Sequence, residues 1–445
     1  MEWHATVVVF SAFAYSFWFN LIGAEGAGAL LIALTLVTLT VWIPPRFRRR
    51  GGLLTAGTAP WAVFAYAGLA LLSAFWSHWP GVSALTLLLF ASATVHGLFL
   101  VDRFEGRELI AIAGRALRAV VILSLVMELW VAVVRRAPLM PNFADAPSDP
   151  DPHWYWVRGN LLDGFLSGGR AQGAVGNANL LGVLCLLTAL VCIVQLLAGQ
   201  GSRLYLAAVA TVSVWLIIRT GSATVLVALV VVVATAAFVI AFRSIRSRRG
   251  RALMSAGLGA VAALSVALVI LFREPLTHLL GRQGTFTGRV NIWEAVLERA
   301  GQSPVIGHGF ATPWLPWDPA FDGWIVDHSI VVFQAHNMWL DVYLQLGAFG
   351  VFCLTAVALQ ALLKSWKLAV AVRSPVALFP LMVVVVLLIQ GMTESTPLML
   401  WGWLAFTTCA TTIGSPRGPY ARVIAKEETF TYSADAGRVP SPSTR

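Results

Sequence analysis

The feature that most constrains this chain is a series of long apolar stretches that recurs along almost its whole length. Most of them can cross a hydrocarbon core of about 30 Å as an α-helix that rises about 1.5 Å per residue. With 58% hydrophobic and only 12% charged residues, a 445-residue chain has too little polar surface for a water-soluble globule of that size. The sequence therefore predicts an all-α integral membrane protein with about twelve spans, at residues 5–22, 26–44, 60–76, 82–101, 117–134, 177–198, 203–219, 222–242, 252–272, 337–362, 376–393 and 397–413.

Basic residues predict how these spans are oriented. Most of the 31 Lys and Arg residues fall in alternate loops, around residues 46–50, 103–118, 243–251 and 364–373, and in the tail after residue 413. The positive-inside rule places these loops and both termini in the cytoplasm, with the protein in the plasma membrane. The net charge of +10 then reflects contact with anionic membrane lipids, and nucleic acid is not an expected partner.

Two segments on the opposite, extracytoplasmic side are too long to be simple turns, residues 135–176 and residues 273–336. Long loops of this kind tend to be functional. Within the second, residues 288–300 predict a short interfacial helix with one apolar face, formed by Ile292, Trp293, Val296, Leu297 and Ala300. The predicted transmembrane domain is residues 1–413, and residues 414–445 predict a disordered cytoplasmic tail.

The predicted outer loops contain arginine but almost no lysine, which suggests a phosphate-bearing ligand because a guanidinium matches phosphate oxygens. Arg170 lies in a glycine-rich stretch that continues to Asn177 and Asn179. There, backbone N–H groups and a guanidinium can face an anion together. The alternative is a polar loop whose arginine reaches the lipid headgroups.

Two further arginines extend this hypothesis. Arg219 ends the seventh predicted span, and a charge at such a junction is costly unless it is paired or hydrated. Arg289 opens the predicted interfacial helix. We therefore treat Arg170, Arg219 and Arg289 as candidates that converge on one diphosphate.

His336 heads the most distinctive pattern, in which His336-Asn337 leads into the tenth predicted span and Gly347-Ala-Phe-Gly350 follows. Eleven residues separate His336 from Gly347, close to three turns at about 3.6 residues per turn, so a continuous helix would stack them on one inward face. The small glycine would let another helix approach there. Histidine can take a proton from a hydroxyl near neutral pH. The alternative is an interfacial histidine that caps the helix.

Other acids and histidines of the outer side remain open. Glu394 follows the eleventh predicted span and is expected to orient a histidine, to bind sugar or only to cap the span. His308 and His328 lie in the large loop near three aspartates, but their irregular spacing does not predict a metal site.

Three segments resemble the O-antigen ligase and polymerase superfamily. They are Arg170–Asn179, the stretch from Gly288-Arg-Val-Asn-Ile-Trp293 to Gly307-His-Gly309, and above all His336-Asn337 with nine residues before Gly347-x-x-Gly350. The last is similar to a ligase signature of His-Asn, nine residues and Gly-x-x-Gly. The twelve-span layout also resembles that family.

The resemblance implies an inverting glycosyltransferase of the GT-C type that uses no metal or cofactor and takes a glycan from undecaprenyl diphosphate. His336 would be the general base on the acceptor hydroxyl, and Arg289 would hold the diphosphate. Independently of the resemblance, we take Asn177, Asn179, Asn337 and Glu394 as candidate supporting residues. The family often has an arginine directly after a Thr-Gly-Ser-like triplet, where this chain has Ala223. Arg219 is four residues earlier and would substitute for it from the same helix face.

The acceptor separates the functional alternatives. A ligase would transfer the glycan to a lipid-bound acceptor such as the lipid A-core oligosaccharide of lipopolysaccharide, and the spacing of glycines after His336 favours this reading. A polymerase would extend a chain on the same carrier, and a protein O-oligosaccharyltransferase would modify a polypeptide. A transporter of the lipid-linked glycan would need inverted repeats or charges near span centres, and neither is clear in the sequence.

Overall fold

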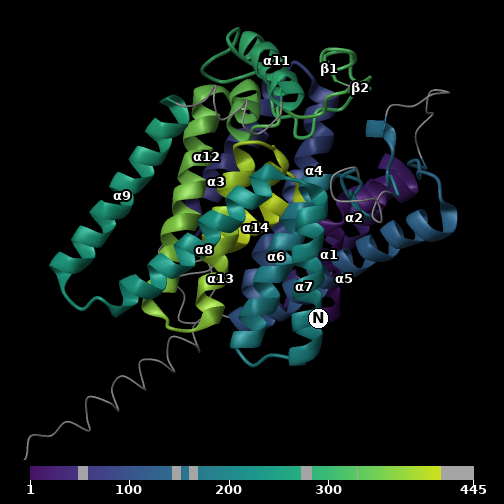
Figure 1. Cartoon of the computed structure of the whole chain (residues 1–445). Helices are drawn as coiled ribbons and strands as arrows, with labels where there is room; N and C mark the ends of the chain where they lie inside the picture. Colours follow the sequence, from purple (N-terminus) through teal and green to yellow (C-terminus); the bar gives the residue numbers. More distant parts are fainter. Residues whose placement is uncertain (49–58, 143–151, 160–168, 272–282, 328, 412–445) are drawn as a thin grey trace, which may run out of the picture.

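The computed structural model describes residues 1–48, 59–142, 152–159, 169–271, 283–327 and 329–411, and shows an all-α integral membrane protein (Figure 1). The predicted tail, residues 414–445, lies outside the described residues, as do parts of both long outer loops. The helices are α1 (Glu2–Phe13), α2 (Tyr15–Arg48), α3 (Trp61–Leu72), α4 (Pro80–Arg103), α5 (Gly106–Leu129), α6 (Ala178–Leu197), α7 (Arg203–Thr220), α8 (Ala223–Ser244), α9 (Arg248–Leu271), α11 (Gln283–Ala300), α12 (Met338–Ala371), α13 (Pro375–Gly391) and α14 (Leu400–Thr411).

Short elements complete the description. They are the 3₁₀ turns η1 (Ser73–Phe75), η3 (Pro152–Trp154) and η4 (Thr396–Leu398), the π-helical turn η2 (Trp130–Arg135), and a hairpin of β1 (Val326–Asp327) and β2 (Ile330–Val331). In the hairpin Val326 is opposite Val331.

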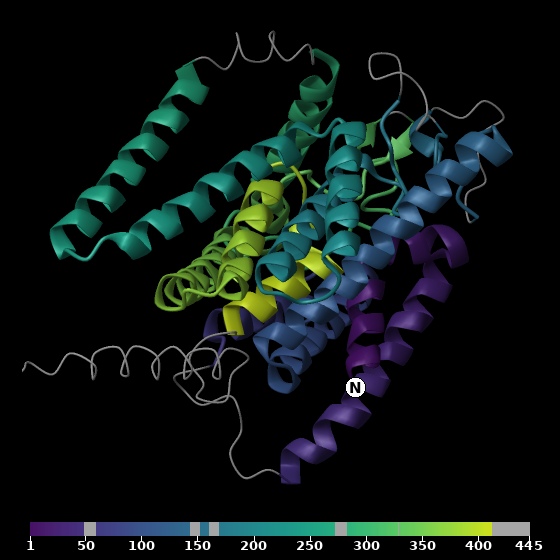
Figure 2. The ribbon, with the colours of Figure 1, turned by 60° about the horizontal axis from the view of Figure 1, so that its bottom comes forward.

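Each of the twelve predicted segments falls on helical structure. The first two predicted spans meet at Gly23, whose φ of 73° breaks α2 and reverses the chain. Figure 2 shows α1 and the long part of α2 running side by side. Among the described residues, seven helices are long and apolar enough to cross a membrane. Two further apolar helices are shorter: α3 together with η1 (Trp61–Phe75), and α13.

The predicted outer and inner loops separate to opposite ends of the bundle. Loops predicted outside bond to one another, as in His78 N–H to His308 O (2.9 Å), Asn142 N–H to Asn20 O (3.0 Å) and Ala171 N–H to Arg219 O (3.0 Å). Loops predicted inside do the same, as in Trp42 Nε1 to Asp102 Oδ2 (2.6 Å) and Arg243 Nη2 to Val372 O (2.7 Å). The alternation derived from basic residues therefore agrees with the geometry of the bundle.

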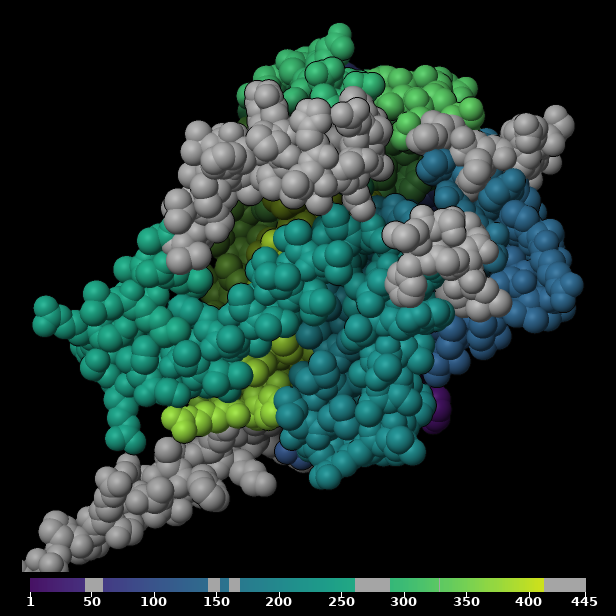
Figure 3. All heavy atoms as spheres, viewed as in Figure 1, coloured from purple at the N-terminus to yellow at the C-terminus, as the bar shows by residue number. Residues whose placement is uncertain are grey.

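The core of the bundle surrounds α6, which is almost entirely apolar on all sides between its polar residues Asn179 and Gln195. In its most apolar stretch 83% of the residues are buried, against 22% in the still more apolar α8. An all-apolar helix is either enclosed by protein or faces lipid, so α6 is central and α8 peripheral. The neighbouring α9 projects from the side of the bundle (Figures 1 and 3).

Helix α11 packs onto the protein through one row of its residues. Its buried residues Ile292, Val296 and Ala300 form one row at four-residue spacing, which contributes to a small second core with Trp314 and Leu344. Leu297 is one position further around the helix and 46% exposed. The prediction that this helix lies at the outer membrane interface stays a prediction.

The predicted continuous helix from His336 to Gly347 is also wrong. Gly347 has φ 60° and ψ −158°, which interrupts α12, and His336 precedes the helix with φ 49°. A side chain at Gly347 would collide with the backbone of Val305, because the Pro304–Gly309 loop lies against this break. Ala348 N–H bonds to Pro304 O (2.9 Å) and Gly309 N–H to Gln345 O (2.8 Å). The glycine thus admits a loop, where the sequence predicted a helix.

Candidate functional site

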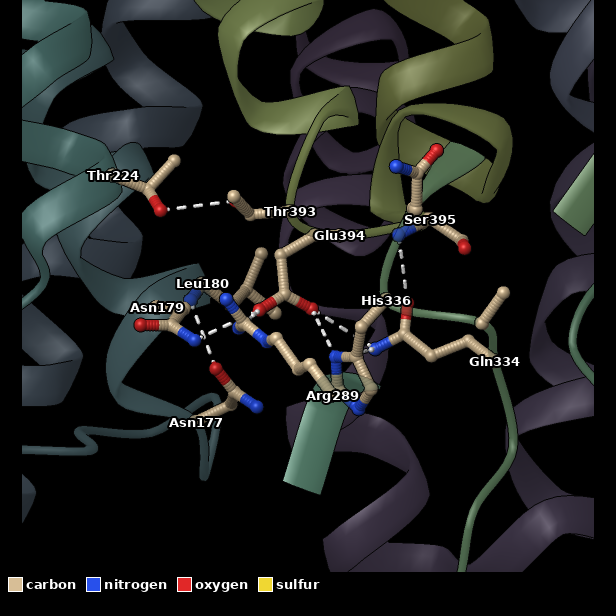
Figure 4. A network of polar contacts seen from close by, with 12 residues as sticks. Asn177, Asn179, Leu180, Thr224, Arg289, Gln334, His336, Thr393, Glu394 and Ser395 are labelled. Carbon is tan, nitrogen blue, oxygen red and sulfur yellow. Dashed lines mark hydrogen bonds and ion pairs between the residues drawn. The ribbon is translucent and has the colours of Figure 1, made fainter. Parts of the chain in front are cut away.

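Glu394 is the centre of a polar network at the end of the bundle that holds the predicted outer loops (Figure 4). Its Oε1 accepts hydrogen bonds from Asn179 Nδ2 (2.8 Å) and Arg289 Nη2 (2.9 Å). Its Oε2 accepts from Gln334 Nε2 (3.1 Å) and lies 2.9 Å from His336 Nδ1. One carboxylate therefore joins four side chains from three separate parts of the chain.

The ends of helices bring these groups together. Glu394 follows α13 directly, Asn179 lies in the first turn of α6, and Arg289 lies in α11. Gln334 is fixed at both ends of its amide, because its Oε1 accepts from Ser395 N–H at 2.9 Å. His336 is turned toward Glu394 by its left-handed backbone conformation, which is uncommon for a residue with a side chain.

Two of the predicted supporting residues are helix caps. The side chain of Asn177 accepts from Leu180 N–H (3.0 Å) at the start of α6. The side chain of Asn337 accepts from Trp339 N–H (3.0 Å) and Leu340 N–H (3.3 Å) at the start of α12. Both satisfy backbone donors that a helix start leaves unpaired. Asn337, not His336, is thus the residue that caps α12.

The charge on Glu394 determines how His336 is oriented. Burial of Glu394 raises the pKa of this carboxyl, but His336, Arg289 and Asn179 together outweigh burial and hold the pKa below its ordinary value. An ionised carboxylate can only accept hydrogen bonds, so Nδ1 of His336 carries the proton toward Glu394. In a neutral imidazole Nε2 then has the free lone pair.

Exposure divides the network into a buried centre and an accessible edge. The side chain of Glu394 is 3% exposed, while those of His336 and Arg289 are 25% and 22% exposed. His336 as a base and Arg289 as a cation can therefore contact a bound molecule, while the carboxylate of Glu394 between them stays excluded from solvent. This arrangement suits removal of a proton next to a site that stabilises negative charge.

Arg170 joins this network through Asn179. Its Nη2 donates to Asn179 Oδ1 (2.5 Å) and its Nε donates to Thr220 O (2.6 Å). Asn179 in turn donates to Glu394. Arg170, Arg289 and His336 thus lie around one pair of residues, Asn179 and Glu394.

Arg219 has different surroundings. Its side chain is buried and interacts electrostatically with Glu128 of α5. The prediction that Arg219 shares a helix face with Ala223 was wrong, because α7 ends at Thr220 and Gly221 (φ 56°) separates it from α8. Residues four apart share a face only within one helix.

Glu128 and Gln334 are the polar residues of this region that the sequence interpretation missed. Glu128 accepts from the backbone N–H groups of Gln172 and Gly173, both at 2.8 Å. A lone acid in an otherwise apolar span is a signal that was available for Glu128. For Gln334, two residues before His336, the sequence offers no comparable signal.

His308, in the large outer loop, is held by contacts with other residues of the protein. Its Nε2 lies 2.8 Å from Arg299 O, and its ring centre is 4.8 Å from that of His78. Burial, followed by His78 and Arg299, lowers the pKa of His308 to about 4. Within the described residues, no three His, Cys, Asp or Glu side chains gather as a metal site would require, and His328 lies outside them.

The aromatic residues of the large loop also differ in environment. Trp314 is buried, stacks on Phe321 with ring centres 5.8 Å apart and donates to Asp341 Oδ1 (3.0 Å). Trp324 carries the guanidinium of Arg299 on its ring, 3.5 Å from the centre, while Trp317 is exposed. Of these three tryptophans, Trp317 is the one open to contact with a sugar or a membrane interface.

Comparison with known proteins places this geometry in a family context. The family model described as O-antigen ligase matches residues 188–355, which contain α7 to α11 and the first half of α12. The exopolysaccharide production protein ExoQ of Rhizobium meliloti (strain 1021) is 24% identical over 328 residues. That match covers 68% of this chain and 65% of ExoQ, so the chain spans slightly less than two thirds of the relative's length.

Proposed function

We propose that this chain is a member of the O-antigen ligase and polymerase superfamily and a membrane-embedded inverting glycosyltransferase of the GT-C type, which the family-model match and the similarity to ExoQ support. Its donor is a glycan on undecaprenyl diphosphate, and its acceptor is a hydroxyl on the outer side of the plasma membrane. The observation that carries the proposal is the Glu394 network, in which one buried carboxylate holds both the accessible His336 and the accessible Arg289.

His336 is the general base in this proposal. As the acceptor hydroxyl oxygen attacks the anomeric carbon, its proton passes to Nε2 of His336. The Nδ1–H of the resulting imidazolium bonds to Glu394, whose negative charge stabilises the positive ring. Attack from the face opposite the leaving group gives inversion at that carbon.

The leaving group is undecaprenyl diphosphate, whose bond to the anomeric carbon breaks as the new glycosidic bond forms. Arg289 uses one N–H donor on Glu394, and a guanidinium has five, so others can bond to phosphate oxygens. Arg170 reaches the same region through Asn179. The two cations stabilise the charge that develops on the diphosphate, and this step uses no metal or cofactor.

A ligase that transfers the glycan to a lipid-bound acceptor, such as the lipid A-core oligosaccharide, is our leading proposal. It rests on the O-antigen ligase match and on the spacing of His336, Gly347 and Gly350. A polymerase is the second candidate, because the relative ExoQ is described as an exopolysaccharide production protein. The donor chemistry is the same in both.

The experiment uses the full-length protein in liposomes with undecaprenyl-diphosphate glycan, in the presence of a metal chelator. One reaction supplies lipid A-core oligosaccharide, and a second supplies only the donor, so that chain extension is detected separately. Replacement H336A is expected to lower the transfer rate by about 10²- to 10⁴-fold, the usual contribution of a general base.

The matched control is H153A, which removes an exposed histidine of the first outer loop and should transfer at the wild-type rate. Transfer by H336A at the wild-type rate would refute the general-base role. Movement of the donor across the bilayer without transfer to either acceptor would refute the transferase proposal and favour a transporter.

A further inference from the structure

A second buried carboxylate, Glu128, holds the loop that carries Arg170. Its Oε1 accepts from Gln172 N–H and Gly173 N–H, both at 2.8 Å. One turn earlier on α5, Ser124 Oγ accepts from Ala174 N–H at 3.1 Å. Three consecutive backbone donors of the loop are thereby bound to one face of α5.

Consecutive backbone N–H groups that point at one oxygen form an anion-binding nest. The sequence predicted that this glycine-rich loop would offer such groups to a ligand. In the structure, Gln172 and Gly173 direct them at Glu128, an anion of the protein itself. Gly173 is required there, because it has φ 59° and a side chain would approach Ser124 Cβ to 2.6 Å.

Arg219 provides the opposite charge on the other side of the loop. The residues are 1% exposed for Glu128 and 6% for Arg219, and the two charges interact. A buried carboxylate is costly unless it is paired and hydrogen-bonded. The main-chain carbonyl of Arg219 also accepts from Ala171 N–H at 3.0 Å, so the arginine contacts the loop through its backbone as well.

The outcome of these contacts is a fixed position for Arg170. The residue next to it, Ala171, is bound to Arg219, and the following two residues are bound to Glu128. Arg170 itself bonds to Thr220 O, the residue next to Arg219, and to Asn179. Displacement of the loop would therefore remove Arg170 from the Glu394 network.

We propose that Glu128 and Arg219 are positioning residues, two buried residues of opposite charge that bind adjacent residues of the Arg170 loop and hold it against α5 and α7. Arg219 is thereby assigned to the support of the site and not to direct contact with the diphosphate. The effect on catalysis rests on the proposed function, because it acts through the donor contact of Arg170. The effect on the loop does not.

The first test is independent of catalysis and uses limited trypsin cleavage of the full-length protein in liposomes, with products identified by mass. Glu128→Gln keeps the shape but loses the charge. Loss of hydrogen bonds to a charged group should increase cleavage after Arg170 by about tenfold or more. Glu294→Gln, at an exposed glutamate of α11, is the matched control and should cleave at the wild-type rate.

The second test measures donor kinetics for Glu128→Gln, Arg219→Met and the double variant. Each single variant should raise the donor KM by about tenfold with little change in kcat, since a displaced binding group weakens donor binding. The double variant should be no worse than the poorer single variant, because the two residues act as a unit. Arg203→Met, at the exposed start of α7, is the control.

The outcomes separate the two proposals. Unchanged cleavage after Arg170 in Glu128→Gln overturns the positioning role, whatever the activity. Losses that multiply in the double variant also overturn it, because they indicate that Arg219 acts independently, as a direct diphosphate contact would. Absence of transfer by the wild-type protein refutes the proposed function and leaves the cleavage result to judge the loop. The double variant lacks both charges, so it tests the pair even where Arg219→Met alone folds poorly.

Discussion

Glu394 and Glu128 are two buried carboxylates that lie on either side of the same arginine loop, and they bind different kinds of partner. Glu394 binds side chains, two of which reach the surface at His336 and Arg289. Glu128 binds backbone N–H groups and interacts with a buried arginine. The first is therefore suited to influence a reaction, and the second to fix the shape of the chain.

The different partners of these two acids show that burial of an acid does not by itself indicate a catalytic role. Both side chains accept hydrogen bonds from neighbouring donors, as a buried carboxylate requires. What separates them is access, because only the partners of Glu394 include a group with a free lone pair near the surface. Variants that remove the charge from each acid in turn test whether the two acids differ in this way.

Glu394→Gln should have the larger effect on rate. Since His336, Arg289 and Asn179 hold the pKa of Glu394 below its ordinary value, this carboxylate stays ionised in mild acid, and its contribution to kcat is lost only as the pH falls through that lowered pKa. The neutral amide of the variant no longer stabilises the imidazolium, so kcat should fall roughly a hundredfold at neutral pH.

The measurement for this variant is kcat at neutral and at mildly acidic pH, beside that of Glu128→Gln. The latter should keep a kcat close to the wild-type value, because Glu128 lacks a direct contact with His336 among the described residues. Losses of kcat of equal size in both variants would show that the two carboxylates do not differ in their influence on the reaction.

Asn179→Ala should have an intermediate effect. Asn179 bonds both Arg170 and Glu394, so its removal breaks the bridge between these two side chains. We expect kcat/KM for the donor to fall about tenfold, the value of one lost hydrogen bond to a charged group. Retention of full activity would show that Arg170 does not depend on this bridge.

The sequence predicted the helices well because apolar length is a local property that the chain displays directly. It also selected His336, Arg289, Arg170 and Glu394 one by one. Their convergence depends on contacts such as His336 with Glu394, which are 58 residues apart, and local patterns do not contain that distance. The same limit explains the missed break at Gly347, which is set by the loop that packs against it.

Asn177→Ala should have the smallest effect and completes the comparison at the level of neighbouring residues. Asn177 and Asn179 are two positions apart, yet the first caps α6 and the second bonds Glu394. Loss of an N-cap costs about 1 kcal/mol of stability, which in a chain of this size lowers the Tm by about 2 °C or less. We expect kcat/KM to stay within about twofold of the wild-type value, since within the described part of the chain the recorded side-chain bond of Asn177 goes to the backbone of α6 and not to the network. Thermal unfolding and donor kinetics on the same liposomes measure both quantities.

A different result would change the assignment of Asn177. If Asn177→Ala lost as much activity as Asn179→Ala, the whole first turn of α6 would belong to the site, and Asn177 would not be a helix cap alone.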